Sequence, residues 1–444
     1  MPAPRSAESG HASAPRRHGR RPWWIPHFLG SVPDIEPQLL TLLGLVSLAL
    51  FFEQYDLSML TSALKFIAAD LGMAESDLGG YTSLMRLGAL PAFIIIPFAD
   101  RIGRRHLFLA SVIGTSTATL LTALSQSAAQ FVVCQVVVRT FLVTGLSVAF
   151  VIVTEEFPAV HRGWAIGMLG ALGTCGNGLG AALFAAIHVL PYGWRALYLI
   201  GVVPLLLLPR FRRDVRETKR FQRHREHRAE MDDAAGALRW LQPLVELARR
   251  HPWRATAIGV VGILGPFGSM AVFQFIGYFT QTVHGWEPWR FSVMVLVGGG
   301  IGIIGNVVAG RLGDRFGRRI VGLVFMALFP VCVWIFYRGP GWSLPLSWTV
   351  LVFCATAGDV VMRALSTELF PTSHRSAAAG WLSLVNTVGA AAGLGVVGLG
   401  TRAPGDLARM ISLLSLSMLV AGCLLFLLPE TSRRELEAIN PDEK

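Results

Sequence analysis

The chain has 444 residues, of which 53% are hydrophobic and 15% are charged. A soluble protein of this length would carry about 25% charged residues, so the composition excludes an ordinary soluble domain. The formal net charge of +11 is compatible with nucleic-acid binding, but the basic residues lie in loops between long apolar runs, so we expect no nucleic-acid partner.

Residues 1–38 are polar, basic and rich in proline, without the short apolar core of a signal peptide, and we expect a disordered cytoplasmic tail. Beyond them, apolar runs of about 20 residues recur, which is the length that crosses a bilayer as a helix. The runs do not alternate polar and apolar residues as barrel strands do, so each is predicted to be helical. The predicted spans are 39–60, 78–98, 107–124, 130–153, 164–187, 194–209, 255–279, 291–310, 320–337, 345–366, 377–400 and 407–428.

These spans predict an all-α polytopic membrane protein with twelve transmembrane helices in two pseudo-symmetric six-helix bundles, 39–209 and 255–428. Between them, the basic loop 210–254 has helical apolar spacing in its second part, which predicts an amphipathic helix on the membrane surface. Residues 429–444 form a short second tail. Of the 39 lysine and arginine residues, 30 fall in the tails and even-numbered loops, so the positive-inside rule predicts that both termini are cytoplasmic.

Three short segments recur at an offset of 213 or 214 residues, each pair following equivalent spans of the two bundles. Duplication of a six-helix unit explains this offset, and folds built in this way bind substrates near the bilayer midplane, between the repeats. The pairs are 100–105 with 314–319, 154–162 with 367–375, and 217–220 with 430–433.

The repeated segments resemble a known family. The run from Gly310 to Arg319 is similar to the loop signature of major facilitator transporters, and 155–162 and 368–375 resemble the partner signature of the sugar-porter and metabolite:proton symporter branches. Pro429-Glu430-Thr431 resembles the end of the last helix in those branches. The resemblance implies cytoplasmic salt bridges that hold an outward-facing state. The gate residues that it implies are Asp100, Arg101, Gly103, Arg104, Arg105, Glu155, Arg162, Gly310, Asp314, Arg315, Gly317, Arg318, Arg319, Glu368 and Arg375.

Some positions depart from the family pattern. Ile96 stands in the first loop copy where the signature has glycine. The fifth span lacks the Gly-Pro of drug antiporters, and the seventh lacks the paired glutamines of sugar porters. These departures disfavour drug export and weaken a sugar assignment.

Charged residues inside the spans are functional candidates, because a charge at mid-bilayer costs a few kcal/mol. Glu53 and Asp56 lie on one helix face, in a segment that resembles the Asp-Gly-x-Asp pattern of aromatic-acid:proton symporters. Arg139 has a similar predicted depth, so we expect it to pair with Asp56, either as a proton-loading site or as a static ion pair. Arg86 is expected to neutralise Glu53. Further candidates for the cavity wall are Asn177, Gln274, Tyr278 and Asn386, while Asp359 and Arg363 are expected to form a structural bridge.

No lysine follows a glycine, so the sequence does not contain the Gly-Lys step of the phosphate-binding loop of ATPases. It also contains no metal-binding motif. We therefore expect neither an enzyme nor a cofactor. The favoured hypothesis is a monomeric, proton-coupled symporter of a small organic metabolite in the cell membrane. The alternatives are a proton-linked exporter and a non-transporting sensor on the same scaffold.

Overall fold

The computed structural model describes residues 22, 24–25, 32–218, 242–302, 304–370, 374–403 and 405–432, without the side chains of Asp100, Gln242, Pro243 and Ser376. In these ranges the chain is helical and no strand occurs. Twelve helical segments are long and apolar enough to cross a membrane, so the predicted fold class is confirmed. The expectation of disordered tails falls mainly on residues outside the described ranges.

Four of the first six spans are single helices, whereas the second and sixth spans are divided into shorter helices at prolines and glycines. The second span breaks near Gly88 and Pro97, and the sixth breaks near Gly201 and Leu207, because proline removes a backbone donor and glycine weakens a helix. The elements are α1 (Pro37–Asp70), α2 (Glu75–Leu87), α3 (Leu90–Ile95), η2 (Ile96–Phe98), α4 (Ala99–Ile102), α5 (Arg104–Ala123), α6 (Ala128–Glu156), α7 (Ala159–Phe184), α8 (Trp194–Ile200), α9 (Val203–Leu206) and α10 (Leu208–Asp214).

The last six spans follow the loop helix α12. Their helices are more continuous, and the prolines inside α13 and α16 are accommodated within long helices. The elements are α12 (Gln242–Arg250), α13 (Pro252–Thr282), α14 (Pro288–Gly302), α15 (Ile304–Phe316), α16 (Arg318–Arg338), η4 (Gly341–Ser343), α17 (Leu344–Glu368), α18 (Arg375–Gly400), α19 (Asp406–Leu424) and η6 (Leu425–Leu427).

Three predictions from the sequence need adjustment. The first span was expected to end at residue 60, but α1 continues to Asp70, because Lys65 finds a partner in the carbonyl of Gln281 at 2.8 Å. The sixth span is three short helices instead of one. In the described part of the loop the helix α12 has Leu247 buried and packs on α13 and α18, so it lies against the bundle.

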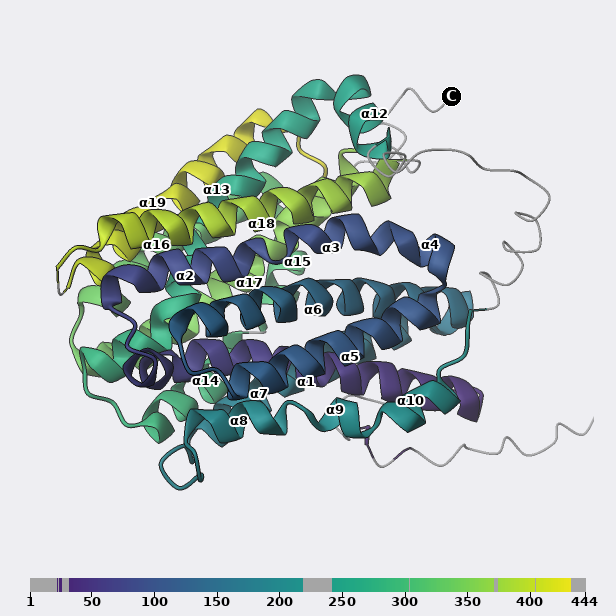
Figure 1. The fold of residues 1–444 in the computed structure, drawn as a ribbon. Helices are drawn as coiled ribbons and strands as arrows, with labels where there is room; N and C mark the ends of the chain where they lie inside the picture. The colour runs from purple at the N-terminus through teal and green to yellow at the C-terminus, as the bar shows by residue number, and fades with distance from the viewer. Residues whose placement is uncertain are drawn as a thin grey trace, which may run out of the picture.

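In Figure 1 the first half (spans one to six) runs from purple through blue to teal, and the second half (spans seven to twelve) runs from teal through green to yellow. Helices α4, α10 and α12 lie at one end, which we call the charged-loop end. The halves meet through the pairs α2–α18, α1–α13 and α7–α14. Helices α2 and α18 run side by side across the middle of the view.

The contacts between the halves are closest at the end opposite the charged loops. Gly79 of α2 lies so near α18 that a Cβ atom there would be 2.2 Å from the backbone nitrogen of Gly398. Gly277 of α13 similarly abuts the carbonyl of Thr61 on α1, where a Cβ would lie 2.5 Å away. These backbone-to-backbone contacts hold the halves together at this end, which we call the closed end.

Candidate functional site

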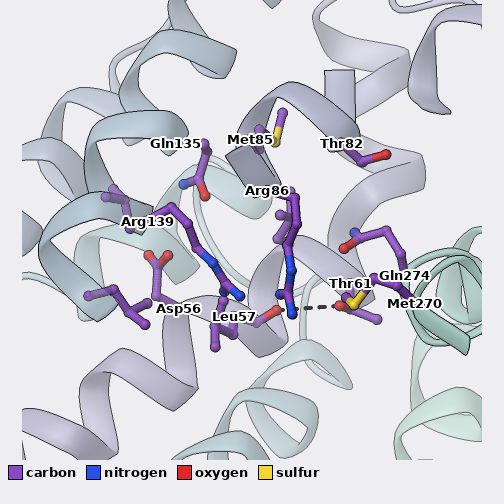
Figure 2. A pocket seen from close by; sticks show the side chains of 13 residues that line it. Asp56, Leu57, Thr61, Thr82, Met85, Arg86, Gln135, Arg139, Met270 and Gln274 are labelled. Carbon is purple, nitrogen blue, oxygen red and sulfur yellow. Dashed lines mark hydrogen bonds between the residues drawn. The ribbon is translucent and has the colours of Figure 1, made fainter. Parts of the chain in front are cut away.

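A cavity of about 110 Å³ lies between the halves and receives side chains from α1, α2, α6 and α13. Figure 2 shows Arg86 and Arg139 extending into the same space, with Asp56 beside Arg139 and Gln274 on the opposite wall. The volume would hold a few water molecules or part of a small organic molecule. The lining residues are Asp56, Leu57, Leu60, Thr61, Thr82, Met85, Arg86, Gln135, Val138, Arg139, Leu142, Met270 and Gln274.

Asp56 is the acidic residue of this cavity and is only 3% exposed. Its Oδ1 accepts a hydrogen bond of 3.2 Å from Thr119 Oγ1, while its buried Oδ2 has no hydrogen-bond partner. Arg139 faces the same cavity, and its Nε also has no partner. The structure therefore places both groups at one site without a direct hydrogen bond between them, and their functional pairing stays a prediction.

The expectation that Arg86 neutralises Glu53 is not met. Arg86 lines the Asp56 cavity, whereas Glu53 lies in a separate hollow beside α5 and α9. Glu53 precedes Asp56 by almost one helical turn, and this angular offset is enough for its side chain to enter the hollow beside α5 and α9 and not the Asp56 cavity. Arg86 therefore has no acidic neighbour of its own in the cavity, which holds two arginines and one aspartate.

The remaining polar candidates divide between sites. Gln274 lines the Asp56 cavity, as expected, and its buried Nε2 has no partner. Tyr278 instead donates a hydrogen bond of 3.4 Å to Glu75 of α2, so it joins the two halves. Asn386 lines a second cavity of about 100 Å³ within the second half, and Asn177 contributes its backbone carbonyl as the acceptor for Ser58.

Salt bridges at the charged-loop end repeat in the two halves. Arg104 Nη2 lies 3.2 Å from Glu155 Oε1, and Arg318 Nη2 lies 2.7 Å from Glu368 Oε1. Arg318 also contacts Asp314 at 3.5 Å. These bridges join helices within one half, α5 to α6 and α16 to α17. They therefore brace each half.

Other expected gate residues have different surroundings. Arg162 and Arg375 do not pair with the glutamates of their own segments, which contact Arg104 and Arg318 instead. The guanidinium groups of Arg101 and Arg315 lie over the rings of neighbouring phenylalanines. Gly310 has open space where a Cβ would stand, and the side chain of Asp100 lies outside the described residues. Across the fold, Asp359 and Arg363 form the expected bridge at 2.8 Å.

Glu217 and Glu430 were not among the predicted site residues, although both belong to the repeat. Each carboxylate accepts backbone hydrogen bonds from the first residues of a helix: Glu217 from Arg104 and Arg105 of α5, at 3.0 and 3.3 Å, and Glu430 from the start of α16, at 2.9 and 3.2 Å. An anion at a helix N-terminus satisfies free N–H groups and the helix dipole. The sequence signal that could have identified these two glutamates is their recurrence at the repeat offset of 213 residues.

Glycines make room for these capping carboxylates. Gly103 and Gly317 precede the capped helices with φ values of 106° and 96°, a conformation that side chains disfavour. A Cβ atom on Gly317 would lie 2.9 Å from Glu430 Oε2. Burial raises the pKa of Glu430, but backbone hydrogen bonds from Ser432 and from the residues after Gly317 outweigh it, so the pKa of this carboxyl lies below its usual value.

Comparison with known proteins identifies the family. The model of the Major Facilitator Superfamily matches residues 46–337 and 292–443, and the chain belongs to this superfamily. A cis,cis-muconate transport protein of Acinetobacter baylyi is 26% identical, with 79% of this chain and 85% of that protein covered. A gallate transporter of Pseudomonas putida is 24% identical, with 79% and 82% covered.

Solved structures share the fold. The inward-open xylose transporter of E. coli superposes with a TM-score of 0.70 at 17% identity, covering 91% of this chain and 99% of that one. An inward-facing bacterial homologue of the lysosomal transporter Spinster gives a TM-score of 0.71 at 16% identity, covering 88% and 97%. Together with the twelve apolar helices, the family match makes this chain a multi-pass membrane transporter.

Proposed function

We propose that the chain is a proton-coupled symporter that carries a small organic acid anion by alternating access. The observation that carries the proposal is the charge balance of the central cavity: Arg86 and Arg139 face one carboxylate, Asp56. Buried charges need partners, so a cavity with a surplus guanidinium favours an anionic ligand over a neutral sugar or a cation. The relatives named above are transporters of muconate and gallate, both carboxylates.

Proton coupling follows from competition for Arg139. While Asp56 is charged, its carboxylate shares the cavity with Arg139 and attracts the guanidinium across the low-dielectric interior. Protonation of Asp56 removes that attraction, and Arg139 then becomes available to a substrate carboxylate. Proton and substrate would therefore bind together and leave together, which is the requirement for symport.

Alternating access is supported by the closed end of the molecule. If the charged loops are cytoplasmic, as the positive-inside rule predicts, the closed end faces outward and this is an inward-facing state. We propose this orientation in the cell membrane, with both termini cytoplasmic and with the monomer as the transport unit, since one chain supplies every wall of the cavity. The charged-loop clusters would then brace each half during the transition.

The test is a panel of radiolabelled compounds, comprising carboxylates, neutral sugars and organic cations, in vesicles reconstituted with the protein. Carboxylates should accumulate when the exterior is acidic, and a protonophore should abolish accumulation. Accumulation under the opposite gradient would indicate a proton-linked exporter. Failure of every compound to cross, with protein folded in the vesicles, would favour a sensor, and a preference for sugars or cations would contradict the anion site.

A further inference from the structure

Glu53 lies in a small hollow that the mechanism above does not use. The hollow has a volume of about 10 Å³, close to the lower limit for one water molecule. Glu53 is 4% exposed, and its Oε2 has no hydrogen-bond partner. The residues around the carboxyl group are Ala49, Phe52, Val112, Thr115, Ser116, Thr119, Gly145, Gly201 and Pro204.

These surroundings contain no cation. Helix α5 presents hydroxyl and aliphatic groups, α6 presents Gly145, and the segment from α8 to α9 presents Gly201 and Pro204. Asp56, on the same helix, is the nearby titratable group on α1 and is itself acidic. A carboxylate buried without a cation costs several kcal/mol, whereas a neutral carboxyl group is tolerated. Glu53 therefore rests in its hollow with a proton bound.

The second half of the protein has no acid at the position of α13 that is equivalent to Glu53. The two halves can be aligned by an equivalent glycine contact. In the first half Gly176 of α7 contacts the carbonyl of Phe51, and in the second half Gly389 of α18, 213 residues after Gly176, contacts the carbonyl of Ile263. By this alignment Glu53 corresponds to the stretch Gly265-Pro266 of α13. Gly145, which abuts Glu53, corresponds to Gly358, which faces Met326 instead. The equivalent space in the second half is lined mostly by apolar groups, and the acid on its wall, Asp359, comes from α17 and is bridged to Arg363.

Thr119 connects the hollow to the central cavity. Its Oγ1 donates a hydrogen bond of 3.2 Å to Asp56 Oδ1, and the same side chain lines the hollow that holds Glu53. A hydroxyl group can accept one proton while it donates another. Thr119 therefore stands between a neutral carboxyl group and a carboxylate that faces the substrate cavity.

We propose that Glu53 is a second proton-carrying residue of the transport cycle and exchanges its proton with Asp56 through Thr119. The Glu53 proton passes to Thr119 Oγ1, directly or through one water molecule, while the original Thr119 proton passes to Asp56 Oδ1. Glu53 becomes a carboxylate, Asp56 becomes a neutral carboxyl group, and Thr119 is unchanged. The proposal rests on the proton coupling proposed above.

The test separates coupled from uncoupled transport in reconstituted vesicles, using a labelled carboxylate that wild type accumulates. Glu53→Gln mimics the permanently protonated residue. It should exchange substrate across the membrane but lose accumulation driven by an acidic exterior, and its exchange should depend less on pH than that of wild type. Thr119→Val should also lose accumulation, and Thr119→Ser, which restores the hydroxyl group, should regain it. Thr117→Val on the exposed face of α5 is the matched control and should resemble wild type.

The outcomes are distinct. If wild type itself shows no accumulation driven by the proton gradient, the proposed function fails before this inference is reached. If wild type accumulates substrate and Glu53→Gln does so equally, the proton role of Glu53 is wrong. Should Glu53→Gln not reach the membrane, Thr119→Val decides the matter, since accumulation equal to that of wild type would overturn the relay.

Discussion

At the scale of single residues, Asp56 carries the coupling in this account. Its carboxyl group is almost fully buried and touches the substrate cavity. Asp56→Asn imitates the protonated form, because the amide has a similar shape and no charge. We expect it to abolish accumulation driven by a proton gradient while substrate exchange continues. Uptake assays with and without the gradient would show this, and concentrative uptake by the variant would refute the role of Asp56.

The predicted pairing of Asp56 with Arg139 would have consequences for stability. Arg139→Ala would leave a buried carboxylate without its compensating cation, a change that costs about 3–5 kcal/mol in comparable buried pairs. The double substitution Asp56→Asn with Arg139→Gln removes both charges and should be less damaging to thermal stability than Arg139→Ala alone. Melting curves of the purified variants measure this. Strictly additive losses would argue that the two groups do not interact.

The sequence was informative about these residues for a physical reason. Charges are rare inside membrane spans, so Asp56, Arg86 and Arg139 were recognisable as site candidates before the fold was known. The direction of each side chain was not, and the expected contact of Arg86 with Glu53 was wrong because Arg86 of α2 lines the Asp56 cavity, whereas Glu53 of α1 lines a separate hollow beside α5 and α9. The hydrogen bond of Tyr278 to Glu75 was not predictable either, because a polar residue in a span can line a cavity or bind the opposite half.

At the scale of the helices, closure of one end depends on glycines that let backbones touch. A side chain on Gly79 would collide with the backbone of Gly398. Gly79→Val should therefore disfavour this closed state by about 1–3 kcal/mol, the usual cost of overpacking. Each 1.4 kcal/mol or so changes the ratio of closed to open molecules about tenfold. Labelling of a reporter cysteine placed in the cavity should become faster from the end that is closed here.

The neighbouring Gly80 provides the control for this experiment. A Cβ atom on Gly80 meets nothing within 4 Å, so Gly80→Ala should leave the labelling rate unchanged. Equal labelling of Gly79→Val and wild type would show that the α2–α18 contact does not hold the end closed.

A second prediction for the helices concerns the cap of α16. Glu430→Ala removes the acceptor of backbone hydrogen bonds and should destabilise the protein by about 1 kcal/mol, as loss of a helix cap does. Glu430→Gln keeps one acceptor oxygen and should have an intermediate effect.

The stabilisation by Glu430 should also depend on pH. Because the folded-state pKa of Glu430 is lowered, its contribution to stability is full above the unfolded-state pKa near 4.5 and disappears as pH falls through the folded-state pKa. Thermal melts as a function of pH would reveal this, and identical profiles for wild type and Glu430→Ala would contradict it.

At the scale of the whole molecule, the two halves share salt bridges and helix caps, but they contribute different kinds of residue to the central cavity. Salt bridges and helix caps recur at the repeat offset in both. The charged groups of the cavity all come from α1, α2 and α6 of the first half, whereas α13 contributes Met270 and Gln274. We infer that the first half handles charge and the proton, while the second half shapes the opposite wall.

The same scale shows what the sequence could and could not predict. Span length, the positive-inside rule and the internal repeat together predicted twelve helices in two bundles, because lipid allows few alternatives. They could not predict which end is closed. That depends on backbone contacts such as those of Gly79 and Gly277, and the same helices support both states of an alternating-access cycle.

The most direct measurement of the central claim is proton movement during transport. Vesicles containing the wild-type protein are placed in a weakly buffered medium with a pH indicator, and a carboxylate from the panel is added outside. Symport predicts that the medium becomes more alkaline as labelled substrate enters, and that Asp56→Asn vesicles show no such change. Entry of the substrate through the wild-type protein without proton uptake, or with protons moving in the opposite direction, would contradict the account.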